Sequence, residues 1–360
     1  MSDFIGIDIG NKLNFICVLN REGKELFVGS IPNTKEAMLE YFDSIEKSSV
    51  VLEVCSHSPW ISKLLVSIGH DVFICNPRKL SSVTQNIKKS DEEDCQMLAK
   101  LLLTGKHLLS PVHHAKEDAM RDFLLIKSRR SLVKCRTILI NNSRGVVKAF
   151  GERISPNLSP DAFHKYAGAS LKKETYEKIK DLIVVVGKTT DQILKYEKNI
   201  NTLIKKKYPA AQLLQTINGV GPLTSLTYVL TIDDPARFEK SRDVGAFLGL
   251  VPRRDQSGDK DKQLPITKAG SKLLRSLLLN CANFILSEKG EDNQIKRFGL
   301  KIRGDGTSKS RSNKAKVAVA RKLSVIMHQL WISNTPFISI NNNKVGKTKK
   351  SEITKICEVW

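Results

Sequence analysis

Apolar and polar positions in the first hundred residues predict a small sheet with helices packed on it. Segments rich in β-branched residues or with alternating polarity predict strands, and apolar residues at helical spacing predict helices. The predicted strands cover residues 4–10, 14–20, 24–32, 49–55 and 71–77, and the predicted helices cover 34–47 and 60–69. Because strands alternate with helices, we expect an α/β sheet covered by helices.

The remainder of the chain has helical spacing. Two long stretches, about 116–150 and 171–207, predict a helical hairpin or coiled coil, and residues 210–335 predict a further helical module. The tail is polar and basic, which predicts disorder. The expected domains are an α/β domain at 1–112, a helical or coiled-coil region at 113–209, a mostly α-helical domain at 210–335 and the tail at 336–360.

The charge is unevenly distributed along the 360 residues. The formal net charge is +22, yet residues 1–100 hold 11 Lys and Arg against 14 Asp and Glu. The other 260 residues therefore hold 48 basic against 23 acidic side chains. An acidic module joined to a strongly basic one predicts a metal-binding catalytic domain beside a domain that grips nucleic acid.

The cysteines and the hydropathy restrict the cellular setting. None of the seven cysteines forms a CxxC pair, and four lie in apolar stretches, which predicts buried free thiols in a reducing compartment. We find neither a signal-peptide pattern nor an apolar run of about 18 residues, so we expect no membrane span and a cytoplasmic location.

Four carboxylates carry the expected chemistry of the first domain. Asp8 in "FIGIDIG" and Glu53 in "VVLEVC" each interrupt an apolar strand, which is costly unless the charge is paired or binds a cation. In "KKSDEEDCQML", Ser90 and Glu93 predict a capping box. Asp91 and Asp94 lie three residues apart and therefore on one helix face. Together the four acids predict a Mg²⁺ site, with Mn²⁺ as an alternative, in which two ions clamp a scissile phosphate.

The opening strand also fits another class of protein. "GIDIG" is compatible with the phosphate-cradling turn of sugar-kinase and actin-like folds. Its continuation, Asn11-Lys12-Leu13, lacks the Ser, Thr and small residues usual in such turns.

The basic half contains two motifs that predict contact with nucleic acid. "INGVGPLT" resembles a helix–hairpin–helix turn in which Gly219 and Gly221 expose backbone N–H groups to a phosphate. Residues 248–275 predict a flexible polar loop, where Ser257 beside Gly258 is either a turn residue or a nucleophile toward phosphorus. The basic residues expected to bind nucleic acid around it are Arg253, Arg254, Lys260, Lys262, Lys268, Lys272 and Arg275.

Taken in order, these motifs resemble the DEDD-type transposases of the insertion-sequence one-ten family, which includes pilin-gene invertases and bridge-RNA-guided recombinases. "GIDIG", "LEVCSHSPW" and "KKSDEEDCQMLAKLL" resemble the family's acidic blocks. "INGVGPLTS", "FLGLVPRRDQSG", "ITKAGSKLLR" and "VAVARKL" resemble its C-terminal domain. The resemblance covers about residues 4–110 and 210–335.

The resemblance implies an RNase H/RuvC-like first domain with Asp8, Glu53, Asp91 and Asp94 as metal ligands. It also implies that Ser257 forms a covalent link to DNA. The implied partners are donor and target DNA and a guide RNA. Further copies of the chain are implied as well, as a dimer formed through the helical region at 113–209 and a tetramer assembled on DNA, with a site composed across subunits. A Holliday-junction or structure-specific nuclease that activates water remains an alternative, as does a non-catalytic nucleic-acid-binding protein.

Overall fold

The computed structural model describes residues 3–76, 90–109, 111–257 and 260–340. The chain divides into two compact units, unit 1 (Met1–His114) and unit 2 (Ala115–Trp360). The segment 77–89, Gly258 and the part of the predicted tail from 341 onward lie outside the described residues.

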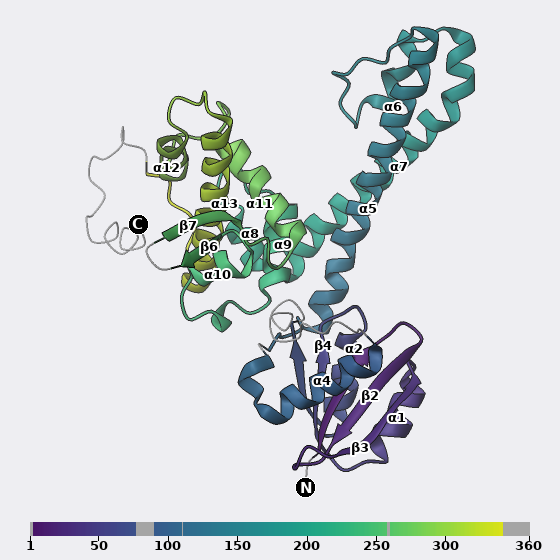
Figure 1. Ribbon diagram of the computed structural model, residues 1–360. Helices are drawn as coiled ribbons and strands as arrows, with labels where there is room; N and C mark the ends of the chain where they lie inside the picture. Colours follow the sequence, from purple (N-terminus) through teal and green to yellow (C-terminus); the bar gives the residue numbers. More distant parts are fainter. Residues whose placement is uncertain (1–2, 77–89, 110, 258–259, 341–360) are drawn as a thin grey trace. The chain divides into compact units, whose positions relative to one another are not determined.

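Unit 1 is a mixed α/β domain built on a five-stranded sheet (Figure 1). The strands follow the order β3-β2-β1-β4-β5, in which β1 is antiparallel to β2 and parallel to β4. The strands are β1 (Phe4–Ile9), β2 (Leu13–Leu19), β3 (Glu25–Pro32), β4 (Ser49–Glu53) and β5 (Asp71–Cys75); the helices are α1 (Lys35–Asp43), α2 (Ser58–Ser67), α4 (Asp91–Thr104) and the 3₁₀ turn η1 (Lys106–Leu109). All five predicted strands and both predicted helices are present, with ends shifted by a few residues.

Each face of this sheet has its own apolar layer. Ile5 and Ile7 of β1 pack with Phe42 of α1 and Leu65 of α2 on one face. On the other face α4 covers the sheet, where Val51 packs with Leu98 and neighbouring leucines. Because side chains alternate along a strand, the residues of β1 and β4 between these core positions necessarily point toward α4.

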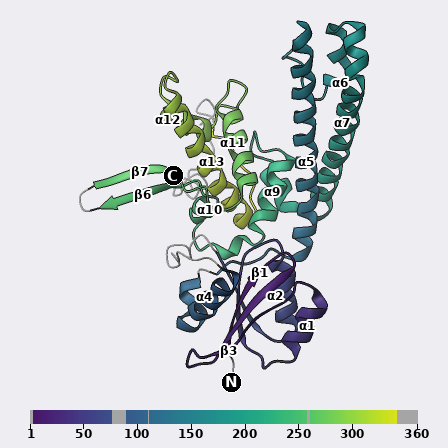
Figure 2. The ribbon, with the colours of Figure 1, turned by 45° about the vertical axis from the view of Figure 1, so that its right-hand side comes forward.

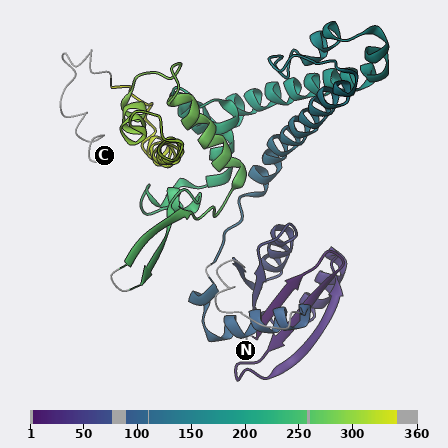
Figure 3. The same cartoon turned by 45° about the horizontal axis from the view of Figure 1, so that its top comes forward.

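Unit 2 starts with a long helical hairpin (Figures 1 and 3). It is formed by α5 (Glu117–Val146) and α7 (Lys173–Lys207), joined by a tip with η2 (Val147–Phe150), α6 (Phe163–Tyr166) and η3 (Ala167–Ser170). The tip has its own core, which includes Ile140, Phe163 and Ile183. At the other end, Ile126 and Ile204 join the core of the C-terminal helices, so the expected boundary at 209/210 does not separate compact bodies.

The C-terminal part of unit 2 is mainly helical, as expected. It contains α8 (Pro209–Leu214), α9 (Pro222–Ile232), η4 (Pro235–Arg237), α10 (Asp243–Phe247), α11 (Lys272–Ile285), α12 (Gln294–Arg303) and α13 (Lys309–Ser333). Tyr228 of α9 is fully buried, and its hydroxyl donates to the carbonyl of Ser324 on α13 at 2.7 Å.

One prediction for this region is wrong. The segment expected to be a flexible loop is a two-stranded antiparallel ribbon, β6 (Pro252–Ser257) and β7 (Lys260–Ile266) (Figure 2). Its sequence lacks the apolar alternation that signals a strand, and the described side chains Arg253 to Gln256 of β6 are exposed, so they need no such alternation. The register pairs Arg254 with Gln263 and Asp255 with Lys262 along the ribbon.

The helices and the cysteines bear on the predictions of no membrane span and of buried free thiols. None of the helices in the described part combines the length and apolar character that a bilayer crossing requires. Among the cysteines, Cys17, Cys75, Cys95 and Cys281 are buried free thiols, and Cys55 and Cys135 are exposed ones.

Candidate functional site

The register of the sheet brings the two strand carboxylates together. Phe4 to Ile7 of β1 pair in parallel with Ser49 to Leu52 of β4, so the residues that follow, Asp8 and Glu53, stand next to each other at the carboxyl ends of both strands. Both are half-buried. They lie two residues beyond Gly6 and Val51, which face α4, and therefore lie on the same face of the sheet.

The helix α4 supplies the other two acids to this face. Its N-cap is Ser90, whose hydroxyl oxygen accepts from the backbone N–H of Glu93 at 3.2 Å, as predicted. The Oε2 atom of Glu93 is buried without a hydrogen-bond partner, so it does not return the bond to the backbone N–H of Ser90. The cap starts the helix so that Asp91 and Asp94 occupy its first turn, with Asp91 exposed and Asp94 half-buried.

The carboxylates of Asp8 and Glu53 each contribute to the pKa of a buried thiol. Burial raises the pKa of Cys95 to about 12, and the charges of Cys17 and Asp8 add to the shift. Burial likewise raises the pKa of Cys75 to about 12, with a further contribution from Glu53. The electrostatic effect of Asp8 therefore reaches the first turns of α4, and that of Glu53 reaches the end of β5. Sequence reasoning treated these cysteines only as core residues.

The four acids suit a hard divalent cation by chemistry. Their donors are all carboxylate oxygens, which Mg²⁺ and Mn²⁺ prefer over nitrogen and sulfur. Within the described ranges, no three His, Cys, Asp or Glu side chains lie close enough to share an ion. The match between these residues and a divalent cation therefore rests on the type of donor atom and on the position of the acids on one face of the sheet. It does not rest on a preformed coordination shell.

A histidine that sequence reasoning missed supports the loop after Glu53. The Nε2 atom of His114 lies 3.0 Å from the hydroxyl of Ser58, which also accepts from the backbone N–H of Cys55 at 3.0 Å. Burial lowers the pKa of His114, so the neutral imidazole is favoured. The segment that leaves unit 1 is thereby attached to the β4–α2 loop. The sequence predicted a helix at 60–69 but gave no signal for this contact.

The predicted serine lies near the end of the ribbon. Ser257 is the last residue of β6 and pairs with Lys260 across the ribbon. The side chains of Ser257, Lys260 and Lys262 are outside what the structure describes. Arg253 and Arg254, on the same strand as Ser257, are exposed and available to an anionic partner. Lys268 and Lys272, beyond the ribbon, are exposed as well.

Arg275 does not fit its predicted role. It is only 8% exposed, and its Nη1 atom donates to the carbonyls of Leu248 at 2.9 Å and Ala269 at 2.6 Å. A guanidinium held in this way is not presented to a polymer at the surface. Of the basic residues that the sequence predicted to bind nucleic acid, Arg275 is buried and binds backbone carbonyls of the protein itself. Its burial depends on packing, which the charge of the side chain does not reveal.

The glycine turn forms one wall of a cavity in unit 2. Gly219 adopts a left-handed φ of +94°, and Gly221 is the N-cap of α9. The cavity has a volume of about 470 Å³ and includes Asn280 and Phe284 of α11 among its lining residues. Neither residue was expected from sequence, because only the tertiary packing brings α11 beside this turn.

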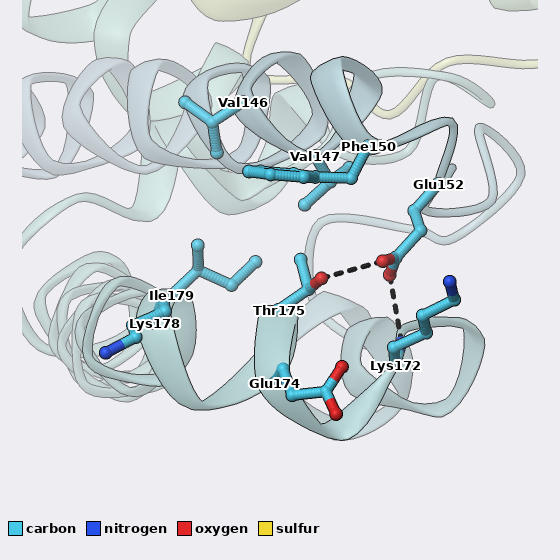
Figure 4. A pocket seen from close by; sticks show the side chains of 9 residues that line it. All are labelled: Val146, Val147, Phe150, Glu152, Lys172, Glu174, Thr175, Lys178 and Ile179. Carbon is cyan, nitrogen blue, oxygen red and sulfur yellow. Dashed lines mark hydrogen bonds between the residues drawn. The ribbon is translucent and has the colours of Figure 1, made fainter.

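Another cavity, of about 560 Å³, lies at the tip of the helical hairpin (Figure 4). Val147, Phe150 and Ile179 line it, and Glu152 accepts from the hydroxyl of Thr175 at 2.7 Å. That bond, together with one from the N–H of Lys172, holds the pKa of Glu152 below its usual range. None of the site residues predicted from the sequence lines this cavity.

Comparison with known proteins gives two family matches in the order that the motifs suggested. The DEDD transposase model of the IS110 group, described as "Transposase", matches residues 5–151. The model described as "Transposase IS116/IS110/IS902 family" matches residues 211–298. The first covers β1, β4 and α4 with the four acids, and the second covers the glycine turn and the ribbon.

Full-length relatives agree with these matches. The chain is 25% identical to the "Transposase for insertion sequence element IS1111A" of Coxiella burnetii, over 91% of this chain and 88% of the relative. It is 24% identical to the "Transposase for insertion sequence element IS1328" of Yersinia enterocolitica, over 92% and 96%. It is also 26% identical to a "Pilin gene-inverting protein" of Moraxella lacunata, over 76% of each. The order of motifs, the two family matches and these relatives identify the chain as a DNA transposase/recombinase of the IS110 family.

Proposed function

We propose that unit 1 is an RNase H/RuvC-like catalytic domain whose acids Asp8, Glu53, Asp91 and Asp94 hold Mg²⁺ or Mn²⁺. The observation that carries this proposal is that Asp8 and Glu53 lie side by side at the ends of β1 and β4, on the sheet face that α4 covers, while α4 begins with Asp91 and Asp94 in its first turn. The strand order, with an antiparallel β1–β2–β3 meander beside the parallel β1, β4 and β5, supports the fold assignment.

The carboxylates and the serine have different tasks in the proposed reaction. Asp8, Glu53, Asp91 and Asp94 would hold and orient the divalent ion. When bound, the ion would supply neutralisation of charge on the scissile phosphate and on the departing oxygen. The Ser257 Oγ attacks phosphorus and forms an O–P bond, its hydroxyl proton is released, and the displaced sugar oxygen takes up a proton. The phosphodiester energy is kept in the serine–DNA link, so reversal onto another DNA end joins new strands.

The basic unit 2 is proposed to bind nucleic acid. Exposed Arg253, Arg254, Lys268 and Lys272, and the turn at Gly219 and Gly221, would contact phosphates of donor and target DNA and of a guide RNA. The net charge of +22 supports an anionic polymer as partner. The long α5–α7 hairpin is proposed to assemble copies of the chain into a dimer, and into a tetramer on DNA.

A denaturing gel separates this mechanism from its alternatives. Protein, nucleic acid copurified with it, duplex or nicked DNA and Mg²⁺ should produce a covalent protein–DNA species that disappears in Ser257→Ala and persists in the control Ser276→Ala. Cleaved ends without an adduct, unaffected by Ser257→Ala, would instead indicate a nuclease that activates water. Binding without any reaction would indicate a nucleic-acid-binding protein.

The metal assignment has its own test. Asp8→Asn should abolish cleavage and remove binding of Mn²⁺ detected by electron paramagnetic resonance, while DNA affinity stays nearly unchanged. Asp43→Asn is a matched control, because Asp43 is a surface acid of the same unit, 74% exposed on α1. Full cleavage by Asp8→Asn would refute the metal site. Sequencing of copurified RNA tests the guide, and a population of unrelated cellular RNA would count against it.

A further inference from the structure

The ribbon β6–β7 depends on its base for its orientation. In the described part of unit 2, neither strand packs extensively on a helix, and Figure 2 shows the ribbon projecting away from the helices of this unit. Arg253 to Gln256 are exposed along β6. An isolated two-stranded ribbon is at best marginally stable in water. What holds it in a defined direction must therefore lie where its two legs meet the helical core.

The two legs interlock at that base through their backbones. Gly249 has a φ of +67°, and a Cβ on it would lie 2.2 Å from the backbone nitrogen of Ala269 on the opposite leg. Gly270 has a φ of +65°, and a Cβ there would lie 2.2 Å from the carbonyl oxygen of Phe247. The backbone N–H of Lys268 donates to the carbonyl of Gly249 at 3.2 Å. The legs are thus in direct backbone contact just before β6 and just after β7.

Arg275 ties this base to the core. The same Nη1 atom donates to the carbonyl of Leu248, on the leg that enters the ribbon, and to that of Ala269, on the leg that leaves it. The side chain comes from α11, whose Leu274 and Leu278 belong to the main core of unit 2. Hydrogen bonds from a charged donor are the stronger kind, and here a single guanidinium connects both legs to a rigid helix.

The length of the ribbon amplifies any movement at the base. From Val251 to Ser257 the strand extends about 20 Å at about 3.4 Å per residue. A rocking of about 10° at the base would then displace Ser257 by about 3 Å, whereas a catalytic group needs to be held within about 0.5 Å.

We infer that Arg275 is a positioning residue for the serine ribbon: by joining the carbonyls of Leu248 and Ala269 to α11, it sets the direction in which Ser257 is presented to DNA. The inference rests on the proposed nucleophilic role of Ser257. It replaces the nucleic-acid contact that the sequence predicted for Arg275. In this role the Arg275 side chain orients the ribbon from inside the protein and does not contact a phosphate.

The test compares full-length wild-type protein with Arg275→Lys and Arg275→Ala. Lysine keeps the charge but has no planar fork to hold the same geometry, so ribbon amides should exchange hydrogen for deuterium at least about tenfold faster. At saturating DNA the single-turnover rate of adduct formation should fall about 100-fold for a misplacement near 1 Å, while the Kd for DNA stays within about threefold. Ser276→Ala, an exposed neighbour on α11, should change neither quantity.

Each outcome has a defined meaning. Unchanged exchange in the ribbon of Arg275→Lys overturns the inference. A loss of DNA affinity that accounts for the whole loss of activity also overturns it, since Arg275 would then act as a contact. If Arg275→Ala fails to fold, the lysine variant still decides the question. An adduct that survives Ser257→Ala refutes the serine mechanism itself, a result that is independent of the exchange rates.

Discussion

Gly6 is the position where the smallest change should most disturb the acidic site. It lies on β1 two residues before Asp8, and α4 passes directly over it. A Cβ at Gly6 would lie 2.1 Å from the carbonyl oxygen of Cys95 and 2.5 Å from the backbone nitrogen of Ala99. Both are helix backbone atoms, so no side-chain rotation relieves the clash. In Gly6→Ala, α4 and β1 must separate by about 1 Å or more to restore contacts of about 3.5 Å.

The cost follows from this geometry. Overpacking of this kind destabilises a protein by about 1–3 kcal/mol. At about 1.4 kcal/mol for each tenfold, 2 kcal/mol lowers the folding equilibrium constant of unit 1 by roughly 30-fold. The same separation moves Asp91 and Asp94 on α4 away from Asp8, and a shift near 1 Å in a catalytic constellation costs about 100-fold in rate. Gly6→Ala should therefore lose cleavage even where it remains folded.

Urea unfolding monitored by circular dichroism measures the free energy of unfolding. The denaturing gel measures the cleavage rate at a temperature where the variant is folded. Gly145→Ala is the matched control, because Gly145 lies inside α5 with nothing within 4 Å of an added Cβ. It should stabilise its helix by up to about 1 kcal/mol. Wild-type stability and cleavage in Gly6→Ala would refute the idea that contact between β1 and α4 sets the spacing of the acids.

Other perturbations test individual contacts. Tyr228→Phe should destabilise unit 2 by about 1–2 kcal/mol in urea unfolding, because the buried carbonyl of Ser324 loses a donor; an unchanged midpoint would contradict this. A thiol reagent at pH 8 should label Cys55 and Cys135 in the native protein, and rapid labelling of the buried thiols would argue against their placement. The stability of unit 1 should fall as the pH rises above about 9. Burial raises the pKa of its thiols above their ordinary value of 9.0, so the unfolded chain releases these protons at a lower pH than the folded protein does, and ionisation favours unfolding. A flat alkaline profile would exclude this linkage. The thiols concerned are Cys17 with a pKa of about 11, and Cys75 and Cys95 with a pKa of about 12.

The sequence by itself determined the elements of unit 1 and singled out the carboxylates of the proposed metal site. Strand and helix periods are local properties, and each follows from the side chains of a few consecutive residues. The cap at Ser90 is equally local, which explains why the start of α4, and with it the place of Asp91 and Asp94, was predicted correctly. A carboxylate inside an apolar strand, as at Asp8, can also be recognised from neighbouring residues alone.

Only the tertiary structure decided how these pieces are used. The pairing of β1 with β4 places Asp8 beside Glu53, although 44 residues separate them in sequence and no local pattern encodes a parallel register. The β6–β7 ribbon was mistaken for a loop, because its charged residues carry no strand signal. Arg275 was grouped with surface charges. Whether an arginine faces solvent or two carbonyls depends on residues distant along the chain, and packing alone brings Leu248, Ala269 and α11 to the same point.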